Sequence, residues 1–362
     1  MPRRVEAAAI RGLRRKRLPS RIRPNDFFKE SDRLRRLFAR VIGAPDPQRI
    51  AIVPAVSYGM AVVARNLDLA AGQNVVTAEE QFPSNVYAWR RLVAEAGAEL
   101  RVVAAPNGPE RGARWNDRLL ETIDRHTGLV ALAPVHWADG TRFDLARIGA
   151  RAREVGAAFV VDGTQSVGAL PFDVAAVRPD ALVCAAYKWL FGPYGLALAY
   201  LGPRFDDGVP LEETWIARRG SEDFDGLVEY VDAYQPGAVR YDVGERSNPV
   251  LLPMAIAALE QLLEWGVDRI QAYCAALTQE LVDEARALGY AVEAPAWRGA
   301  HLFGLRVLAG ASMDALRARL EARRVAVSVR GSAIRVAPNV YNDAADIAAL
   351  GEALREGVSE RT

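Results

Sequence analysis

The chain has 362 residues, of which 51% are hydrophobic and 25% are charged, a balance that is typical of soluble globular proteins and leaves room for two domains. Lysine and arginine together number 46, and aspartate and glutamate number 45. The net charge of +1 therefore gives no reason to expect nucleic acid or an anionic membrane as a partner. No apolar run reaches about 18 residues, and the N-terminal region has no signal-peptide pattern, so we expect no membrane span.

Residues that bind metals or form cross-links are scarce. Cys184 and Cys274, the two cysteines, are too far apart for a disulfide framework or a metal cluster, which predicts a cytoplasmic protein. The three histidines, His126, His136 and His301, show no paired spacing for a metal. We therefore expect a small organic ligand and no metal.

Short runs of valine, alanine and leucine alternate with helical patterns through the first half of the chain. Strands are predicted at 49–55, 73–79, 99–105, 128–135 and 157–163, and helices at 27–41, 57–67, 84–97, 115–124 and 144–156. Helical crossovers of this kind join parallel strands. The pattern predicts an α/β fold whose mostly parallel sheet is covered on both faces.

The pattern changes beyond about residue 250. Two long helices are predicted at 251–265 and 267–289, and short strands with two further helices follow, the strands at 301–308, 324–330 and 333–338. This order is typical of a smaller α+β domain. We place a large domain at 20–248 and a small one at 249–362, with residues 1–19 forming a helix that packs on the small domain. A long, weakly periodic segment at 206–250 joins the two domains, and such segments are more often functional than inert.

Polar side chains follow four of the predicted strands, at the sheet edge where α/β proteins bind ligands. They are Ser57, Tyr58 and Gly59 at a helix start, then Phe82 and Ser84, then His136 and Trp137, and finally Asp162 and Gln165. A hydroxyl and backbone N–H groups at a helix start suit a phosphate, although serine is also a common helix cap.

Lys188 is the one charged residue in the apolar and aromatic segment 181–201. Burial of an unpaired ammonium is costly and lowers its pKa. A lysine in that state is a good nucleophile toward an aldehyde, and a carboxylate such as Asp162 at a neighbouring strand end can hold a protonated pyridine nitrogen. The two residues together predict a pyridoxal-phosphate site.

Three segments carry a resemblance to a known family: "VVDGTQSVGALPFDV" at 160–174, "YKWLFGPYG" at 187–195 and "IRVAPNVYND" at 334–343. Together they resemble the class V aminotransferase family of fold-type-I pyridoxal-phosphate enzymes, which includes cysteine desulfurases, kynureninases and isopenicillin N epimerase-like proteins. The resemblance covers most of the chain. It implies a pyridoxal 5'-phosphate enzyme that acts on an amino acid, as an aminotransferase or a lyase.

The resemblance implies a role for each matching residue. Lys188 would form the Schiff base and move the proton at the substrate α-carbon, and Asp162 would keep the pyridine nitrogen protonated. Gln165 would hydrogen-bond the phenolic oxygen of the cofactor. Phe82 would stack on the cofactor ring, with a place in the core as the alternative.

The expected phosphate site departs from the family pattern. Ser57 would bind through its hydroxyl, with the backbone of Tyr58 and Gly59 assisting, and Tyr187 is a further candidate with simple packing as an equal alternative. Cysteine desulfurases usually have a hydroxyl where this chain has Ala185. Relatives also have a Gly-Thr pair that reaches the partner's phosphate in dimers, and this chain has Glu245, Arg246 and Ser247 there. We therefore expect a homodimer with shared sites, in which Arg246 binds the phosphate, most simply that of the partner subunit.

Three further residues are candidates on the substrate side. His136 falls where relatives often carry Asn or Gln, so it is expected as a polar contact or an acid–base group, with a structural role as the alternative. Arg335 matches the arginine that grips the substrate α-carboxylate. Arg330 is a second carboxylate candidate, whose stronger alternative is a surface role.

Other functions remain as alternatives. An epimerase, a cysteine desulfurase and a non-catalytic descendant would share the resemblance. A desulfurase is disfavoured because it needs a cysteine in a mobile loop, whereas Cys184 falls in a predicted strand and Cys274 in a predicted helix. A nicotinamide-dependent oxidoreductase would need G-x-G-x-x-G after the first strand, and the chain has none there.

Overall fold

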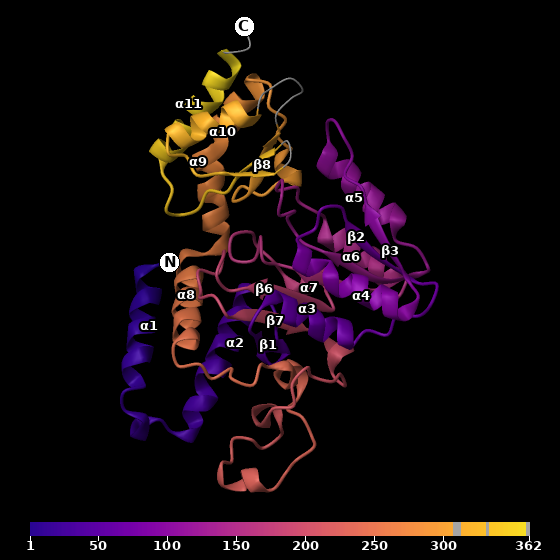
Figure 1. The fold of residues 1–362 in the computed structure, drawn as a ribbon, viewed down its shortest axis with the longest axis vertical. Coiled ribbons are helices and arrows are strands. Elements are labelled where there is room, and N and C mark those ends of the chain that lie inside the picture. Colours follow the sequence, from indigo (N-terminus) through magenta and orange to yellow (C-terminus); the bar gives the residue numbers. More distant parts are fainter. Residues whose placement is uncertain (307–312, 331–332, 360–362) are drawn as a thin grey trace.

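The computed structural model describes residues 1–306, 313–330 and 333–359. Its centre is a seven-stranded sheet with helices on both faces (Figure 1). The order across the sheet is β1-β7-β6-β5-β4-β2-β3. The strands are β1 Ile50–Val53, β2 Asn74–Ala78, β3 Glu99–Val103, β4 Thr127–Leu132, β5 Ala158–Asp162, β6 Ala181–Ala185 and β7 Ala197–Leu201.

The sheet is mostly parallel, as predicted. The β2–β3, β2–β4, β4–β5 and β5–β6 pairs are parallel, whereas β7 runs antiparallel to both of its neighbours, β6 and β1. The parallel strands are connected through helices α4 Tyr87–Ala96, α5 Arg111–Thr122, α6 Leu145–Glu154 and the short α7 Val174–Val177. Helix α3 Val56–Arg65 follows β1 directly. These elements confirm the α/β fold that the alternation predicts.

Two apolar cores cover the two faces of the sheet. Successive residues of a strand point to opposite faces, so Ile50 and Ile52 join one core and Ala51 and Val53 the other. The second core includes α3 and α4, and the first contains residues of helices α2 Lys29–Val41, α5 and α6. Because every residue of β1, β2, β5, β6 and β7 is buried, these strands are mostly apolar along their length and do not alternate with polar residues.

The C-terminal part forms a second, smaller core. A three-stranded antiparallel sheet in the order β8-β10-β9 packs with helices at one end of the molecule (Figure 1). Its strands are β8 Phe303–Arg306, β9 Ser328–Arg330 and β10 Ala333–Val336, and its helices are α9 Val267–Ala287, α10 Met313–Ala322 and α11 Ala344–Ser359. Residues 307 and 308, predicted to extend the first of these strands, lie outside the described residues.

The predicted domain boundary at residue 249 does not coincide with the division between the cores. Helix α8 Leu251–Trp265 buries Leu252 and Leu259 in the large core, and Cys274 of α9 still belongs there. The small core begins further along α9, at Leu281. Helix α1 Arg3–Arg15 packs on α8, which lies within the predicted 249–362 domain but contributes to the large core (Figure 1).

Part of the irregular segment between the domains extends away from the sheet at the bottom of Figure 1, whereas its last turn, Gly237–Tyr241, packs on β1. The segment contains short 3-10 turns at Trp215–Ala217, Asp225–Val228 and Gly237–Tyr241. Among the described residues, no helix has both the length and the apolar character that a membrane crossing requires.

Candidate active site

A cavity of about 210 Å³ lies at the carboxyl ends of the central strands. The loops after β1, β2, β4, β5 and β6 each contribute to its wall. It brings together six of the residues predicted from sequence: Ser57, Phe82, Asp162, Gln165, Tyr187 and Lys188. Parallel strands end at one edge of a sheet, and this is why residues so far apart in the chain meet.

Lys188 stands in the loop between β6 and β7 and faces aromatic rings. Its Nζ lies 5.4 Å from the ring centroid of Phe82 and 5.8 Å from that of Tyr187. Burial lowers the pKa of Lys188, and the positive charge of Arg335 lowers it further, while Asp162 acts in the opposite direction. A lowered pKa makes the neutral amine, which is the nucleophilic form, available closer to neutral pH.

Asp162 ends β5 and is 6% exposed. Its Oδ1 accepts a hydrogen bond from the Thr164 backbone N–H at 3.0 Å, and Thr164 Oγ1 in turn accepts one from the Ala185 N–H at 3.2 Å. Burial raises the pKa of Asp162, against the hydrogen bonds from Thr164 and the charge of Lys188. The carboxylate makes no salt bridge with a described residue, so a cationic ring nitrogen fits here because it would supply the missing charge.

Two amide side chains in the wall differ in how they are satisfied. Gln165 Oε1 accepts a hydrogen bond from Trp189 Nε1 at 3.4 Å, which leaves the Gln165 N–H groups for a ligand. Gln81 Nε2 is buried and has no hydrogen-bond partner among the described residues. An unsatisfied buried donor in a cavity wall is costly unless a ligand accepts from it. Nothing in the sequence distinguishes Gln81 beyond its position before Phe82.

The start of α3 forms the other end of the cavity. Ser57 lines it in the first turn of the helix, where backbone N–H groups are unpaired and attract anions. A Cβ on Gly59 would lie 2.7 Å from Val183 Cγ1, so glycine lets this turn approach β6 closely. Tyr187 stacks on Tyr194, with ring centroids 3.8 Å apart and an interplanar angle of 11°, and both rings line the cavity.

His136 does not reach this cavity, which corrects its prediction as a catalytic or ligand-contacting residue. The side chain is 1% exposed and packs on Trp115. Its Nδ1 lies 3.2 Å from Asp139 Oδ1 and its Nε2 lies 3.1 Å from the Glu79 carbonyl oxygen. Both ring nitrogens are therefore occupied within the protein, and the adjacent residue, Trp137, faces the cavity instead.

Trp137 joins the cavity to the small domain. Its indole meets Phe82 edge to face at 5.5 Å, and its Nε1 donates to the Glu80 carbonyl oxygen at 2.6 Å. Arg335 Nη1 donates to the Trp137 carbonyl oxygen at 2.6 Å, and the Arg330 guanidinium lies 5.3 Å from the centre of the Trp137 ring. Both predicted carboxylate-binding arginines thus lie next to the cavity wall without forming part of it.

The two arginines differ in burial. Arg335 is half-buried, donates from Nη2 to Ser328 Oγ at 3.2 Å, and has an Nε with no hydrogen-bond partner among the described residues. Burial lowers the pKa of Arg335, and Arg330 lowers it further. Arg330 is exposed. Among the described residues, its one hydrogen-bond acceptor is the adjacent Val329 carbonyl oxygen. Of the two, Arg335 is the one held toward the site.

Arg246 lies elsewhere, which corrects its prediction as a phosphate ligand. The side chain is 4% exposed and forms an ion pair with buried Asp242, which also pairs with Arg35 of α2 and accepts from the Ile52 N–H at 2.7 Å. Extending Arg246 toward a partner's phosphate would break this buried pair, which typically costs several kcal/mol. Arg246 instead holds its segment against α2 and β1.

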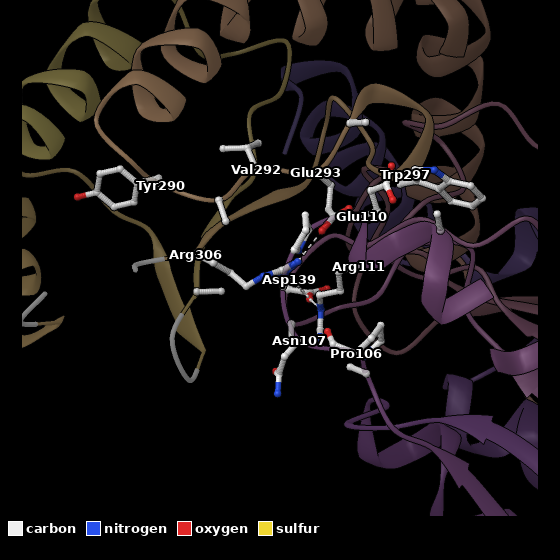
Figure 2. Close-up of a pocket in the computed structure, with 18 of the residues that line it drawn as sticks. Pro106, Asn107, Glu110, Arg111, Asp139, Tyr290, Val292, Glu293, Trp297 and Arg306 are labelled. Atoms are coloured by element: carbon white, nitrogen blue, oxygen red, sulfur yellow. Dashed lines mark hydrogen bonds and ion pairs between the residues drawn. The ribbon is translucent and has the colours of Figure 1, made fainter. Parts of the chain in front are cut away.

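A larger hollow of about 1200 Å³ lies between the two domains (Figure 2). Its centre is Asp139, whose Oδ2 accepts from Arg111 Nε at 3.2 Å and from Arg306 Nη1 at 3.1 Å. Arg306 also donates to Glu293 at 2.9 Å. Two guanidinium groups and two carboxylates therefore neutralise each other at the centre of this hollow.

Comparison with known proteins places the chain in a family. Its sequence matches the model described as aminotransferase class-V over residues 23–350. It is 27% identical over 320 residues to the uncharacterized aminotransferase YcbU of Bacillus subtilis, covering 88% of this chain and 81% of that protein. A cysteine desulfurase of Klebsiella pneumoniae is 28% identical over 260 residues, covering 70% of this chain and 61% of the relative.

Solved structures show the same fold. The apo cysteine desulfurase of Thermococcus onnurineus NA1 has a TM-score of 0.80 and 19% identity, covering 99% of this chain and 92% of that chain. The complex of the cystine C-S lyase C-DES with cysteine persulfide has a TM-score of 0.83 and 21% identity, covering 98% and 94%. Because the family model spans most of the sequence and the fold agrees, the chain belongs to the class-V aminotransferase family of pyridoxal-phosphate-dependent enzymes, with the fold-type-I architecture.

Proposed function

We propose that Lys188 binds pyridoxal phosphate covalently and that the protein acts on an amino acid, as an aminotransferase or a lyase. One observation carries the proposal: a single aromatic-walled cavity holds an amine of lowered pKa and a buried carboxylate that makes no salt bridge with a described residue. When bound, the cofactor supplies an electron-withdrawing ring that takes up the electrons released at the substrate α-carbon.

The residues of the cavity then have distinct tasks. Asp162 holds the ring nitrogen protonated, and Gln165 donates to the phenolic oxygen. Phe82 provides an apolar face against the ring. Lys188, as the free amine, takes up and returns the proton at the substrate α-carbon, for which its lowered pKa is suited.

The phosphate belongs at the start of α3. Ser57 donates from its hydroxyl, and the N–H group of Tyr58 lies in the first turn of the same helix, whose positive end favours an anion. The Gly59 N–H already donates to the Ala55 carbonyl oxygen at 3.2 Å. Tyr187 lines the same cavity and supplies a further hydroxyl. On the substrate side, Arg335 binds the α-carboxylate, and its unpartnered Nε supports that role.

The two cysteines bear on the reaction type. Both are buried, and burial raises the pKa of Cys184 well above its ordinary value and that of Cys274 to about 11. A desulfurase that uses its own thiolate needs a reactive, accessible cysteine. Neither thiol offers one, so aminotransferase or lyase chemistry is the better proposal. Buried free thiols also fit a cytoplasmic protein.

We further propose a homodimer. Lys188 is the one lysine or arginine that lines the cavity among the described residues, so the phosphate end has no cation of its own. Phe82 and Tyr194 in the cavity wall are 37% and 74% exposed. A second subunit would cover this exposed aromatic surface. With Arg246 buried, the residue that the partner contributes is a different one. Sedimentation of the protein at several concentrations tests the assembly.

The proposal is tested by incubating the purified protein with pyridoxal phosphate and recording its absorbance before and after borohydride. A cofactor band that borohydride abolishes is expected. Candidate amino acids are then screened for keto acid, alanine, sulfide or racemised product. Keto acid formed with consumption of an amino acceptor indicates an aminotransferase, and release of a side-chain fragment indicates a lyase. A protein that binds no cofactor would contradict the proposal.

A further inference from the structure

His301 lies behind the wall of the active-site cavity, just before β8, and none of the roles above uses it. Its side chain is fully buried at 0% exposure. Its Nε2 lies 2.9 Å from the backbone carbonyl oxygen of Gln165, and its Nδ1 lies 3.0 Å from the side-chain nitrogen of Gln271 in α9. The imidazole thus connects α9 of the C-terminal part to the loop after β5.

The surrounding groups determine the tautomer of this ring. A carbonyl oxygen can only accept, so Nε2 must carry the hydrogen and donate to Gln165. Gln271 Nε2 donates to the Ala169 carbonyl oxygen at 2.6 Å, and Gln271 Oε1 accepts from the Ala300 N–H at 2.7 Å, which fixes the orientation of that amide. Nδ1 of His301 is then the acceptor from Gln271. Burial lowers the pKa of His301 to about 4, so the ring stays neutral near pH 7.

The same ring also supports the loop that carries Lys188. His301 meets Trp189 edge to face, with ring centroids 4.8 Å apart and an interplanar angle of 89°. Trp189 directly follows Lys188 and donates from Nε1 to Gln165 Oε1 at 3.4 Å. Position 299 has to be small for this packing, since a Cβ on Gly299 would lie 2.6 Å from His301 Cε1.

We propose that His301 is a positioning residue that fixes Gln165 from both ends, through its backbone carbonyl directly and through its side-chain amide by way of Trp189. The Gln165 N–H groups are thereby held in one orientation before any ligand binds. The part that concerns the cofactor rests on the proposed function: a preorganised donor at the phenolic oxygen stabilises the deprotonated form of that oxygen.

The first test uses the cofactor-free protein and nitrogen NMR of its three histidines, with His126→Gln and His136→Gln variants to assign the signals. We expect His301 in the Nε2–H form, with no titration between about pH 8 and pH 5. A hydrogen on Nδ1, or protonation near the ordinary histidine pKa of about 6.5, would overturn the inference. This result does not depend on whether the cofactor binds.

The second test compares His301→Gln with His301→Phe in the cofactor-loaded protein. Glutamine keeps an N–H donor near the place of Nε2, whereas phenylalanine keeps the contact with Trp189 and loses both hydrogen bonds. The readout is the pH midpoint at which the cofactor absorbance band changes. We expect His301→Phe to raise this midpoint by roughly one unit and His301→Gln to leave it nearly unchanged.

Equal midpoints in both variants and in the unsubstituted protein would show that His301 only fills space, and would overturn the proposal. If His301→Phe fails to fold, Trp189→Phe removes the hydrogen bond to Gln165 Oε1 and must raise the midpoint in the same direction. An unsubstituted protein that takes up no pyridoxal phosphate would contradict the proposed function, while the NMR result would still decide the geometry of His301.

Discussion

Asp162 ends β5 and Asp139 follows the neighbouring strand β4, and both are almost fully buried, yet their surroundings are opposite. Burial raises the pKa of Asp162, and no guanidinium is near enough to reverse it. Burial also acts to raise the pKa of Asp139, but the hydrogen bond from His136 and the charges of Arg306 and Arg111 lower it overall.

This difference in charge pairing distinguishes a ligand-binding aspartate from a structural one. Asp139 lies in the larger hollow, with its charge already neutralised, and it joins the two domains (Figure 2). Asp162 lies in the smaller cavity and forms no ion pair with a described residue. The unsatisfied group, and not the volume of the hollow, therefore indicates where a ligand binds.

The largest effect is expected at Lys188, which lines the same cavity as Asp162. Lys188→Ala should lower turnover at least ~10³-fold, because both covalent binding and proton transfer depend on its amine. Borohydride reduction followed by peptide mass spectrometry should find the cofactor on Lys188. The other two lysines, Lys16 and Lys29, are the built-in controls, and an adduct on either would refute the assignment.

A direct comparison of the two aspartates comes next. Asp162→Asn should lower turnover by roughly 10²-fold or more without destabilising the cofactor-free protein, because an amide cannot hold the ring nitrogen protonated. Asp139→Asn should instead lower the free energy of unfolding by about 3 kcal/mol, because it leaves Arg111 and Arg306 without their shared anion. Denaturant unfolding and steady-state kinetics on both variants measure the two effects. If both variants lost turnover and stability to the same extent, the two aspartates would not have the different roles assigned to them here.

Substitution of the two arginines next to Trp137 should affect KM to different extents. Arg335→Lys is expected to raise KM about tenfold or more with a smaller change in kcat, because lysine loses the forked geometry that a carboxylate accepts. Arg330→Lys, the matched exposed control, should change KM by less than about threefold. A larger effect from Arg330 would assign it the substrate carboxylate.

The residues that line the cavity are easier to predict from the sequence than the residues that pack behind them. Lys188, Asp162 and Gln165 were predictable because each stands at a strand end or in an apolar run, where a polar side chain needs a chemical reason. His136 and Trp137 are adjacent, and only the turn geometry decides which one faces the cavity.

Distant partners explain the remaining differences. Arg246 looked available for a phosphate because nothing in its own segment reveals the buried contact of Asp242 with Arg35. The sequence likewise gives His301 no motif, and its place behind Gln165 follows from packing between segments far apart in the chain. Helix α8 has an apolar face that suits either core, so its periodicity alone could not assign it.

The smallest effect concerns stability and pH in the cofactor-free protein. The folded-state pKa of Asp162 is raised above its unfolded value near 3.9, so the carboxylate carries no penalty below that pH and a growing one as the pH rises through the folded value. Asn at this position does not titrate and keeps the acceptor for the Thr164 N–H.

Cofactor-free Asp162→Asn should therefore be more stable than the unsubstituted protein near pH 7, on the order of 1 kcal/mol, with the difference vanishing below about pH 4. For Asp139→Asn the sign is opposite, since a lowered folded-state pKa contributes stability above the unfolded value and loses it in acid. With pyridoxal phosphate added, the unsubstituted protein should become more stable than Asp162→Asn. A stability difference that depends on neither pH nor cofactor would show that Asp162 does not pair with the protonated ring nitrogen.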